Sequence, residues 1–457
     1  MSDPGAGRGV RAVIVGGGLA GITAALALRE AGAEVTLFES RPRLGGATCS
    51  FQRGDLIVDN GQHVFLRCCT AYRGLLDRLG VADKTRIQDR FDVTVLAPDG
   101  RRARLRRAAL PGPLHLLPAL ARYDLLTPAD RLRAVRASLA LRGVDTARDG
   151  ERLGDWLAAH GQRDWARRAL WELFVVAALN IGVDEAVLGP AAMVCQTALL
   201  GRHDAADIGV PDVPLGELHG EAAARLIGTV HLKSKVEAIE PRSDPDRDGP
   251  GGAGFDLIVD GSRVPADVVI VAVPHEVAAD LVPERAAPGR ERWRGLGSSP
   301  IVNVHAVYDR TVMDLPFAAA VDSPVQWVFD RTRVAGQGRG QYLASSVSAA
   351  DEWIDTPTEK IRAAFVPALE RLFPAARQAR ITDFFVTRER RATFRQIPGS
   401  GALRPAAATR LPGLFLAGAW TDTGWPDTME GAVRSGLNAA RLARVSAAAD
   451  VDGGRIR

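Results

Sequence analysis

Three glycines and an acidic residue near the N-terminus have the spacing of a phosphate-binding turn. Gly16, Gly18 and Gly21 lie between an apolar strand-like run and a helical pattern. The first allows a sharp turn, the second lets a pyrophosphate approach the backbone, and the third lets the helix pack on the strand. Glu39 ends a second apolar run, where such units place a carboxylate that binds an adenosine ribose. The pattern predicts a dinucleotide site without a 2′-phosphate, and this unit alone leaves NAD and FAD open.

A second pair of glycines and a distant C-terminal segment extend this candidate site. Gly45 and Gly46 follow a basic loop, where adjacent glycines let the backbone approach another part of a flat cofactor. Near the C-terminus, Asp427 has the spacing of a helix N-cap residue, with Glu430 three positions later. Gly431 and Gly436 lie on the same expected helix, where a close approach would be needed. The amides of that helix start suit the negatively charged N1–C2=O edge of a reduced flavin. Because NAD does not explain glycine sites at opposite ends of the chain, we predict FAD as the cofactor.

Length and composition are typical of a globular protein with two interleaved domains. The chain has 457 residues, of which 46% are hydrophobic and 25% are charged. Residues 1–11 contain no apolar core, and no apolar run reaches the ~20 residues that a membrane span requires. We therefore expect a cytoplasmic protein. The four cysteines have no paired C-x-x-C spacing, so neither a disulfide framework nor a metal site is expected.

Positive charge is concentrated between Arg101 and Arg142, although the whole chain carries only +4. This segment holds ten arginines against Asp124 and Asp130, a net charge of +8, together with many leucines. Basic and apolar residues together indicate either a surface that touches anionic lipid at the inner face of a membrane or an ordinary solvated region. No nucleic-acid-binding motif accompanies the charge, so nucleic acid is not expected as a partner.

Apolar alternation and periodicity predict an α/β protein in which the dinucleotide domain is discontinuous in sequence. The Rossmann-like, FAD-binding domain is predicted from residues 10–90, 228–290 and 385–445. An inserted α+β substrate domain with a helical lobe is predicted from residues 91–227 and 291–384. The strands expected in the first domain are 13–15, 35–38, 230–232, 236–239, 255–259, 266–273 and 414–418. A strand is also expected over 92–96, and those of a second sheet are 302–308, 325–329 and 342–347.

The motifs resemble the FAD-dependent desaturase and amine oxidase superfamily, through Gly46 and over residues 268–274 and 414–440. Within it, Asn60-Gly61-Gln62-His63, residues 201–215 and residues 421–426 resemble the hydroxysqualene dehydroxylases, also called squalene-associated FAD-dependent desaturases. The resemblance implies an FAD domain of the glutathione-reductase type. The chain departs from the superfamily at Ala47, where a basic residue usually helps to hold the pyrophosphate, and at Ala419, where an aspartate is common.

The resemblance also implies which residues hold FAD and which reaction they serve. The expected reaction is the removal of the allylic hydroxyl of hydroxysqualene by hydride from reduced FAD, giving squalene for hopanoid biosynthesis. The reductant that reloads FAD is not indicated. The implied cofactor-binding residues are Gly16, Gly18, Leu19, Ala20, Gly21, Glu39, Ser40, Arg41, Arg43, Gly45, Gly46, Gly61, Gln62, His63, Val236, Gly418, Asp422, Thr428, Met429, Glu430 and Ala432.

Dehydroxylation requires an acid for the departing hydroxyl and an electron-rich cavity for a developing cation. His63 is the candidate acid or orienting group, and the alternative is a histidine that only hydrogen-bonds cofactor or backbone. Trp425 and Phe65 are candidates for the cavity wall. A polar cluster in the apolar lobe is either part of the cavity or a set of surface ion pairs: Arg202, His203, Asp204 and Asp207.

Three other functions occur among proteins that the motifs resemble: amine oxidation, phytoene-type desaturation and non-catalytic transport of prenyl lipids. Amine oxidases of this fold carry a lysine on a substrate-domain strand that corresponds to residues 301–308, and the lysines of this chain all lie elsewhere, which disfavours amine oxidation. Phytoene-type desaturation remains open, because it also handles a long polyprenyl hydrocarbon by hydride transfer. A non-catalytic prenyl-lipid escort of the same fold also remains open, because Ala47 and Ala419 are compatible with a loss of FAD.

Overall fold

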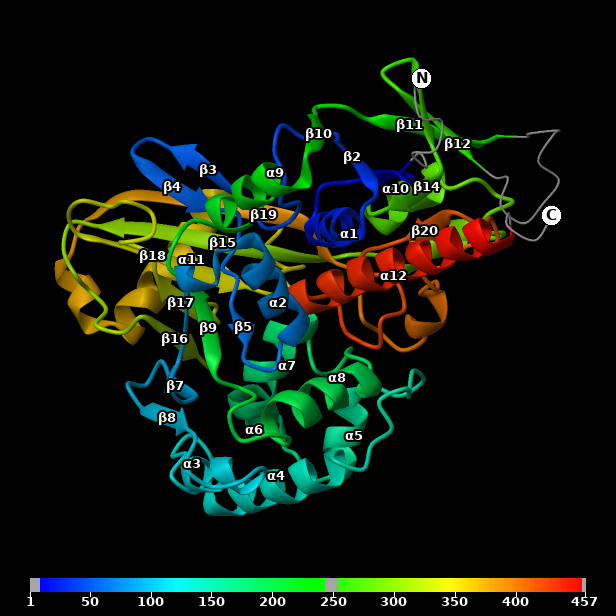
Figure 1. The fold of residues 1–457 in the computed structure, drawn as a ribbon. Coiled ribbons are helices and arrows are strands. Elements are labelled where there is room, and N and C mark those ends of the chain that lie inside the picture. Colours follow the sequence, from blue (N-terminus) through cyan, green and yellow to red (C-terminus); the bar gives the residue numbers. More distant parts are fainter. Residues whose placement is uncertain (1–8, 243–253, 454–457) are drawn as a thin grey trace, which may run out of the picture.

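The computed structural model describes residues 9–242 and 254–453, so part of the predicted 228–290 segment lies outside the described residues. Figure 1 shows a parallel sheet with long helices at one end, a larger sheet beside it, and a lobe of short helices below. Within the described ranges, no helix combines the length and the apolar character needed to cross a membrane.

The parallel sheet contains the predicted dinucleotide unit. Its strand order is β10-β2-β1-β14-β20, with all neighbours parallel. In β1, Ile14 faces the helices while Val13 and Val15 face the opposite side, so both faces are buried. The strands are β1 (Arg11–Val15), β2 (Glu34–Glu39), β10 (Thr229–Leu232), β14 (Val268–Val271) and β20 (Leu414–Leu416).

Helices cover one face of this sheet and a small antiparallel sheet covers the other (Figure 1). The helices are α1 (Leu19–Glu30), α2 (Thr70–Leu79), α9 (Ala222–Ile227) and α12 (Met429–Gly453). The opposite layer consists of β11 (Val236–Pro241), β12 (Phe255–Val259), β13 (Ser262–Ala266) and α10 (His275–Leu281).

The strand expected over 266–273 is two strands, which is a correction. β13 ends at Ala266 and β14 begins at Val268, in different sheets. The break is at Asp267, whose carboxylate accepts hydrogen bonds from the backbone N–H of Arg11 (2.9 Å) and from its guanidinium (2.6 Å). This polar contact joins the start of β1 to the start of β14.

The second sheet has seven strands in the order β19-β15-β18-β17-β16-β7-β8. The strands are β7 (Asp92–Leu96), β8 (Arg102–Arg106), β15 (Ser299–Tyr308), β16 (Phe317–Ala320), β17 (Trp327–Asp330), β18 (Gln341–Val347) and β19 (Ile381–Thr393). Helix α11 (Thr358–Leu372) packs on one face, and the helical lobe packs on the other.

The predicted domain boundary at residue 385 cuts through β19. This strand pairs with β15 from Tyr308 opposite Ile381 to Ser299 opposite Thr393, so it belongs to the seven-stranded sheet. Charged residues interrupt its apolar alternation, and most of its side chains are half-buried or exposed. For that reason the sequence pattern did not indicate a strand there.

The helical lobe is built from short helices within residues 117–194. Its helices are α3 (Leu117–Ala121), α4 (Pro128–Leu141), α5 (Leu153–Ala159), α6 (Asp164–Ala166), α7 (Glu172–Leu179) and α8 (Leu188–Val194). Thr127 caps α4 by accepting a hydrogen bond from the N–H of Asp130. Trp156 and Trp171 lie in the core of the lobe.

Two small sheets and one helix–helix contact join these regions and were not predicted. One is the hairpin of β3 (Ser50–Arg53) and β4 (Leu56–Asp59). The others are a three-stranded sheet of β5 (Phe65–Leu66), β6 (Thr85–Ile87) and β9 (Ile208–Pro211), and a close contact between α1 and α12. A Cβ atom on Gly436 of α12 would lie 2.3 Å from the carbonyl oxygen of Ala20 in α1, so only glycine permits this contact.

We expect Gly436→Ala to lower the free energy of unfolding by about 1–3 kcal/mol, because α1 and α12 would have to separate. The matched control is Gly74→Ala in α2, where nothing lies within 4 Å of the new Cβ. It should raise the free energy of unfolding by about 0.5–1 kcal/mol through helix propensity. Urea denaturation measures both, and equal effects would contradict the packing argument.

Candidate active site

The first glycine turn and the Gly45–Gly46 pair form one cradle. Gly16 has a φ angle of 105°, and a Cβ there would lie 2.5 Å from the carbonyl oxygen of Ala272. A Cβ on Gly46 would lie 2.8 Å from the Cα of Gly18, and the N–H of Gly45 donates to the carbonyl of Gly17 at 2.8 Å. The backbones of the two turns therefore touch at the end of β1.

The start of α1 is suited to a phosphate group. Gly18 precedes the helix in an extended conformation, and no side chain caps the first-turn N–H groups. Leu19 and Ala20 open the helix and are buried. Uncapped amides at a helix N-terminus carry partial positive charge and bind anions. These contacts fit a pyrophosphate at the predicted place.

Glu39 is positioned beside this cradle by hydrogen bonds to the backbone. Its carboxylate accepts from the N–H of Gly17 and from the N–H of Arg41, both at 2.7 Å, and its side chain is buried. The hydroxyl of Ser40 also donates to this carboxylate, at 3.3 Å. A carboxylate has about four acceptor positions, so one remains for a hydroxyl of a ribose. Ser40 and Arg43 are exposed on the same loop. The predicted cradle therefore fits the adenosine part of FAD.

The loop from Asp59 to His63 is held from both sides. Its Asn60 side chain donates to the carbonyl of Ala47 (2.8 Å) and accepts from the N–H of Cys49 (3.0 Å). The carbonyl of Asn60 accepts from Asn303 of β15 at 3.0 Å. The loop therefore connects the glycine cradle to the seven-stranded sheet.

Two amide groups at this loop lack hydrogen-bond partners. Nε2 of Gln62 and Oδ1 of Asn303 are both buried and unpaired among the described residues. Buried polar atoms are nearly always paired in native proteins, so these atoms indicate where a ligand or water binds. They lie next to Gly61, as expected if the loop faces the cofactor.

His63 contacts the backbone of its own loop, and its role as acid or orienting group stays a prediction. Its Nδ1 lies 3.2 Å from the carbonyl of Gly61, so Nδ1–H donates there. Burial lowers the pKa of His63, against the smaller raising effect of that hydrogen bond, so the ring is neutral at pH 7. Its side chain is also absent from the lining of the cavity described below. The alternative, a histidine that bonds the backbone, agrees with this geometry.

The C-terminal half of the predicted site begins at Gly418. This residue has a φ of 139°, and its N–H donates to Ser435 of α12 at 2.8 Å. Asp422 is exposed in the following loop. The N-cap of α12 is Thr428, whose hydroxyl accepts from the N–H of Gly431 at 3.1 Å. Asp427, the predicted cap, instead accepts from the N–H of Phe394 at 2.8 Å.

Glu430 has a structural role that its sequence position did not reveal. Its buried carboxylate accepts from the N–H groups of Ala71 (3.1 Å) and Tyr72 (2.7 Å) at the start of α2, and from Arg434 (2.8 Å). It therefore caps α2 from α12, rather than acting primarily on a cofactor. The N–H of Ala432 donates within α12 to the carbonyl of Thr428, and Val236 is buried at the start of β11.

Arg404 arranges the loop that follows Gly418, a role that was not predicted from the sequence. Its guanidinium donates to the carbonyls of Thr421 (2.6 Å), Trp425 (2.8 Å) and Ala419 (3.0 Å). Burial lowers the pKa of Arg404. The residue lies in an irregular segment without a motif, so the sequence offered no signal for it.

A cavity of about 240 Å³ lies between the helical lobe and the seven-stranded sheet. Phe65 and Trp425 line it as predicted, and Gln62, Thr428 and Met429 also contribute. Most of the wall comes from α7, from the α8 region and from β16 and β17, and none of these residues was predicted from the sequence. Apolar and aromatic examples are Leu173, Phe174, Met193, Leu199, Phe317, Trp327 and Phe329.

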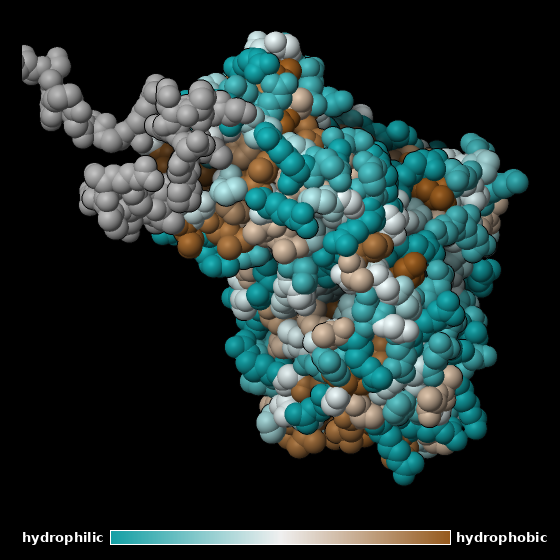
Figure 2. All heavy atoms as spheres, turned by 90° about the vertical axis from the view of Figure 1, so that its right-hand side faces the viewer, coloured by the Kyte–Doolittle hydropathy of each residue, from teal (hydrophilic) through white to brown (hydrophobic). Residues whose placement is uncertain are grey.

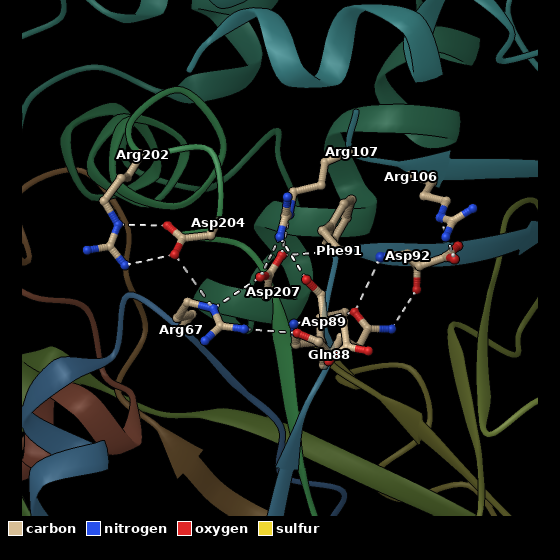
Figure 3. A network of polar contacts seen from close by, with 11 residues as sticks. Arg67, Gln88, Asp89, Phe91, Asp92, Arg106, Arg107, Arg202, Asp204 and Asp207 are labelled. Atoms are coloured by element: carbon tan, nitrogen blue, oxygen red, sulfur yellow. Dashed lines mark hydrogen bonds and ion pairs between the residues drawn. The ribbon is translucent and has the colours of Figure 1, made fainter. Parts of the chain in front are cut away.

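The predicted polar cluster does not line this cavity, which corrects the first of its two interpretations. Arg202 and His203 are exposed, and Arg202 pairs with Asp204 at 2.7 Å. Asp207 is fully buried and is not among the residues that line the cavity. It faces Arg67 and Arg107, as Figure 3 shows. It accepts from Arg107 (2.7 Å), Arg67 (3.0 Å) and the N–H of Phe91 (2.7 Å). This network joins β5, β8 and β9.

Across residues 9–242 and 254–453, no group of three or more His, Cys, Asp or Glu side chains is gathered in a way that suits a metal ion. The four cysteines are free thiols, and Cys68 and Cys69 line the cavity.

Comparisons with known proteins agree with this geometry. The family model of flavin-containing amine oxidoreductases matches residues 19–443. A hydroxysqualene dehydroxylase of Rhodopseudomonas palustris is 31% identical, over 94% of this chain and 97% of the relative. A 15-cis-phytoene desaturase of Solanum lycopersicum is 28% identical, over 93% of this chain and 76% of the relative.

Solved structures share the fold at lower identity. A cyclohexylamine oxidase from Brevibacterium oxydans has a TM-score of 0.72 and 21% identity, over 96% of this chain and 99% of that one. A putrescine oxidase has a TM-score of 0.71 and 19% identity, over 98% of this chain and 99% of that one. The predicted fold class is confirmed by these similarities.

We expect the stability of the protein to depend on the ionisation of Asp427. Burial raises the pKa of this carboxyl to about 6, although Phe394 and Arg404 lower it. Because the folded-state pKa lies above the unfolded one, the stabilisation is complete below pH ~4 and is lost as the pH rises through ~6. In Asp427→Asn, which keeps an acceptor for Phe394, the free energy of unfolding relative to the wild type should rise by about 1–3 kcal/mol from pH 4 to pH 8. Parallel curves in urea titrations would contradict the assignment.

Proposed function

The chain belongs to the flavin-containing amine oxidoreductase family and is an FAD-dependent oxidoreductase, and from this premise we propose that it converts hydroxysqualene reductively to squalene. The observation that carries the proposal is the cavity beside the Asp59–His63 loop, whose wall is mostly apolar and aromatic. Its polar lining residues are Gln62, Thr197, Ser346, Ser348, Thr428 and Glu430. Such a wall suits a long isoprenoid hydrocarbon. The similarity to hydroxysqualene dehydroxylases supports the same substrate class.

The reaction replaces one hydroxyl group by hydrogen. The carbon–oxygen bond breaks, the hydroxyl takes up a proton and leaves as water, and a hydride forms the new carbon–hydrogen bond. When bound and reduced, FAD supplies that hydride. In this assignment, Glu39 and the start of α1 hold the adenosine end of the cofactor, while Gln62 and Asn303 provide polar atoms near the reacting end.

The wall of the cavity contributes by excluding water. Of the described residues that line it, none is Arg, Lys or His, and the carboxylate of Glu430 is already held by three donors. An apolar enclosure keeps water from intercepting a reactive carbon during hydride transfer. This property is needed for dehydroxylation and equally for desaturation.

Of the three alternatives to dehydroxylation, two are disfavoured and one remains as a second candidate. Amine oxidation is disfavoured because β15 carries Asn303 and His305 but no lysine. The escort hypothesis is disfavoured by the family assignment, which makes the chain an FAD-dependent enzyme. Phytoene-type desaturation is the second candidate, supported by the phytoene desaturases that match over most of this chain.

We expect the photoreduced holoenzyme, mixed anaerobically with hydroxysqualene, to form squalene while the absorption of oxidised flavin returns. Gas chromatography measures the product, and the oxidised holoenzyme is the control that should form none. Desaturation of phytoene by the oxidised enzyme, without squalene formation by the reduced one, would replace this proposal by the second candidate.

We further propose that the outer face of the helical lobe contacts anionic lipid at the cytoplasmic face of a membrane. Six of the ten arginines between residues 101 and 142 are paired with carboxylates, so the local charge is smaller than the sequence suggested. Exposed apolar side chains accompany the rest, and Leu132, Arg136 and Leu139 share one face of α4. Figure 2 shows a hydrophobic patch at the lower end of the molecule, where Figure 1 places α3 and α4.

The membrane proposal is tested with vesicles that contain phosphatidylserine. Among the described residues, four exposed arginines of this segment have no carboxylate within ion-pair distance: Arg102, Arg122, Arg136 and Arg142. Changing all four to Glu should lower co-sedimentation by at least about tenfold, since each basic side chain near an anionic surface contributes about 1 kcal/mol. The matched control changes four exposed arginines elsewhere to Glu: Arg29, Arg292, Arg339 and Arg371. Equal losses in both variants would refute a specific surface.

A further inference from the structure

We propose that Phe317, Trp327 and Phe329, here called the sheet aromatics, form a cation-binding wall that stabilises positive charge on the isoprenoid substrate. This inference rests on the proposed reaction, in which loss of the hydroxyl leaves an electron-deficient allylic carbon. The three rings line the cavity together. Their centroids are 5.9 to 6.4 Å apart.

Strand register places these rings on one face of the seven-stranded sheet. Phe317 of β16 lies directly opposite Phe329 of β17, and Trp327 is two residues before Phe329. Side chains two residues apart in a strand point to the same side of a sheet. The rings therefore form a fixed surface on rigid strands, not on a loop.

The electrostatic surroundings leave this surface free to receive a cation. The π face of an aromatic ring carries partial negative charge and attracts cations, most strongly for tryptophan. No Arg, Lys or His is found among the described residues that line the cavity. The sheet aromatics therefore meet no competing cation from the wall itself.

Trp425, the residue expected from the sequence to fill this role, is already occupied. The guanidinium of Arg434 lies 4.5 Å from the centre of its ring, and Arg434 is fixed there by its hydrogen bond to Glu430. A cation on the substrate would be repelled by this arginine. Among the described residues, no comparable cation lies over the rings of the sheet aromatics.

A polar group for the hydroxyl lies beside the same rings. Ser346 of β18 is directly opposite Trp327 of β17, and both residues line the cavity. A substrate hydroxyl that bonds to Ser346 has its carbon next to the indole ring. The wall thus combines a hydroxyl-binding group with the surface that receives the charge left behind.

The experiment compares two probes that differ only in charge. One is a polyprenyl trimethylammonium, and the other is its uncharged carbon isostere with a tert-butyl end. Binding to the oxidised holoenzyme is followed by the change in flavin fluorescence. In the wild type we expect the ammonium probe to bind at least about tenfold more tightly than the neutral probe.

Trp327→Leu and Phe329→Leu replace a ring by an aliphatic side chain and should each remove most of this preference, while the affinity for the neutral probe changes less than about threefold. Trp425→Leu is the matched control and should keep the preference, because its ring is occupied by Arg434. Flavin content and circular dichroism show which variants fold, and two sheet variants keep the test valid if one does not.

Preference retained in both sheet variants, or lost only in Trp425→Leu, would overturn the proposal. Equal loss of both probes in the sheet variants would show that the rings supply shape alone, which also overturns it. Failure of the proposed reaction is recognised separately, because it concerns squalene formation and not the ratio of two affinities. A charge preference without squalene formation would keep the wall and reject the dehydroxylation.

Discussion

The structure depends on one buried joint between the β3–β4 hairpin, which leads into the loop beside the glycine cradle, and the seven-stranded sheet. The carboxylate of Asp59 accepts from Arg331 at 2.6 Å and from the N–H of Leu215 at 3.0 Å, and both charged side chains are almost fully buried. Breaking such a pair by removing one partner costs about 3–5 kcal/mol, because the remaining charge stays buried. The following residue, Asn60, is bound by Asn303 of the same sheet. A cofactor that spans both regions needs this fixed relation, since a shift of about 1 Å at a reacting centre lowers the rate by orders of magnitude.

Around this joint the protein separates charge from apolar surface. Arginine–aspartate networks such as that of Asp207 lie outside the cavity and hold its strands together (Figure 3). Glu430 lies at the cavity, but its carboxylate oxygens accept hydrogen bonds from α2 and from Arg434. The cavity is thus left with π faces, hydroxyls and aliphatic groups. A low-polarity site strengthens the interaction of any charge that develops there with the few groups that face it.

The sequence predicted the parts of the site whose chemistry is local. The glycine turns, the position of Glu39 and the strands of the parallel sheet follow from short patterns, because one turn or one strand determines them. Glu430 binds Tyr72, which is 358 residues away in the chain, and Asp207 binds Arg67, which is 140 residues away. No local sequence pattern indicates such distant partners. Phe317, Trp327 and Phe329 look like ordinary strand residues in sequence, since alternation shows that one face is apolar but not which layer covers it. β19 was not predicted as a strand, because charged residues interrupt its apolar alternation and most of its side chains are half-buried or exposed.

The two polyprenyl reactions considered for this chain make the same demand on its cavity. Removing a hydroxyl before hydride addition leaves positive charge on an allylic carbon, and removing a hydride from a hydrocarbon leaves the same kind of charge. Both therefore need an aromatic wall without competing cations, which is what the strands β16 and β17 present. The wall stabilises the same charge in hydride addition and in hydride removal, so it does not set the direction of the reaction. The direction follows from the redox state in which the cofactor meets the substrate. A polar group such as Ser346 then distinguishes a carbinol from a plain hydrocarbon. On this argument, the cavity of this chain suits either reaction, and its polar groups and the source of electrons decide between them.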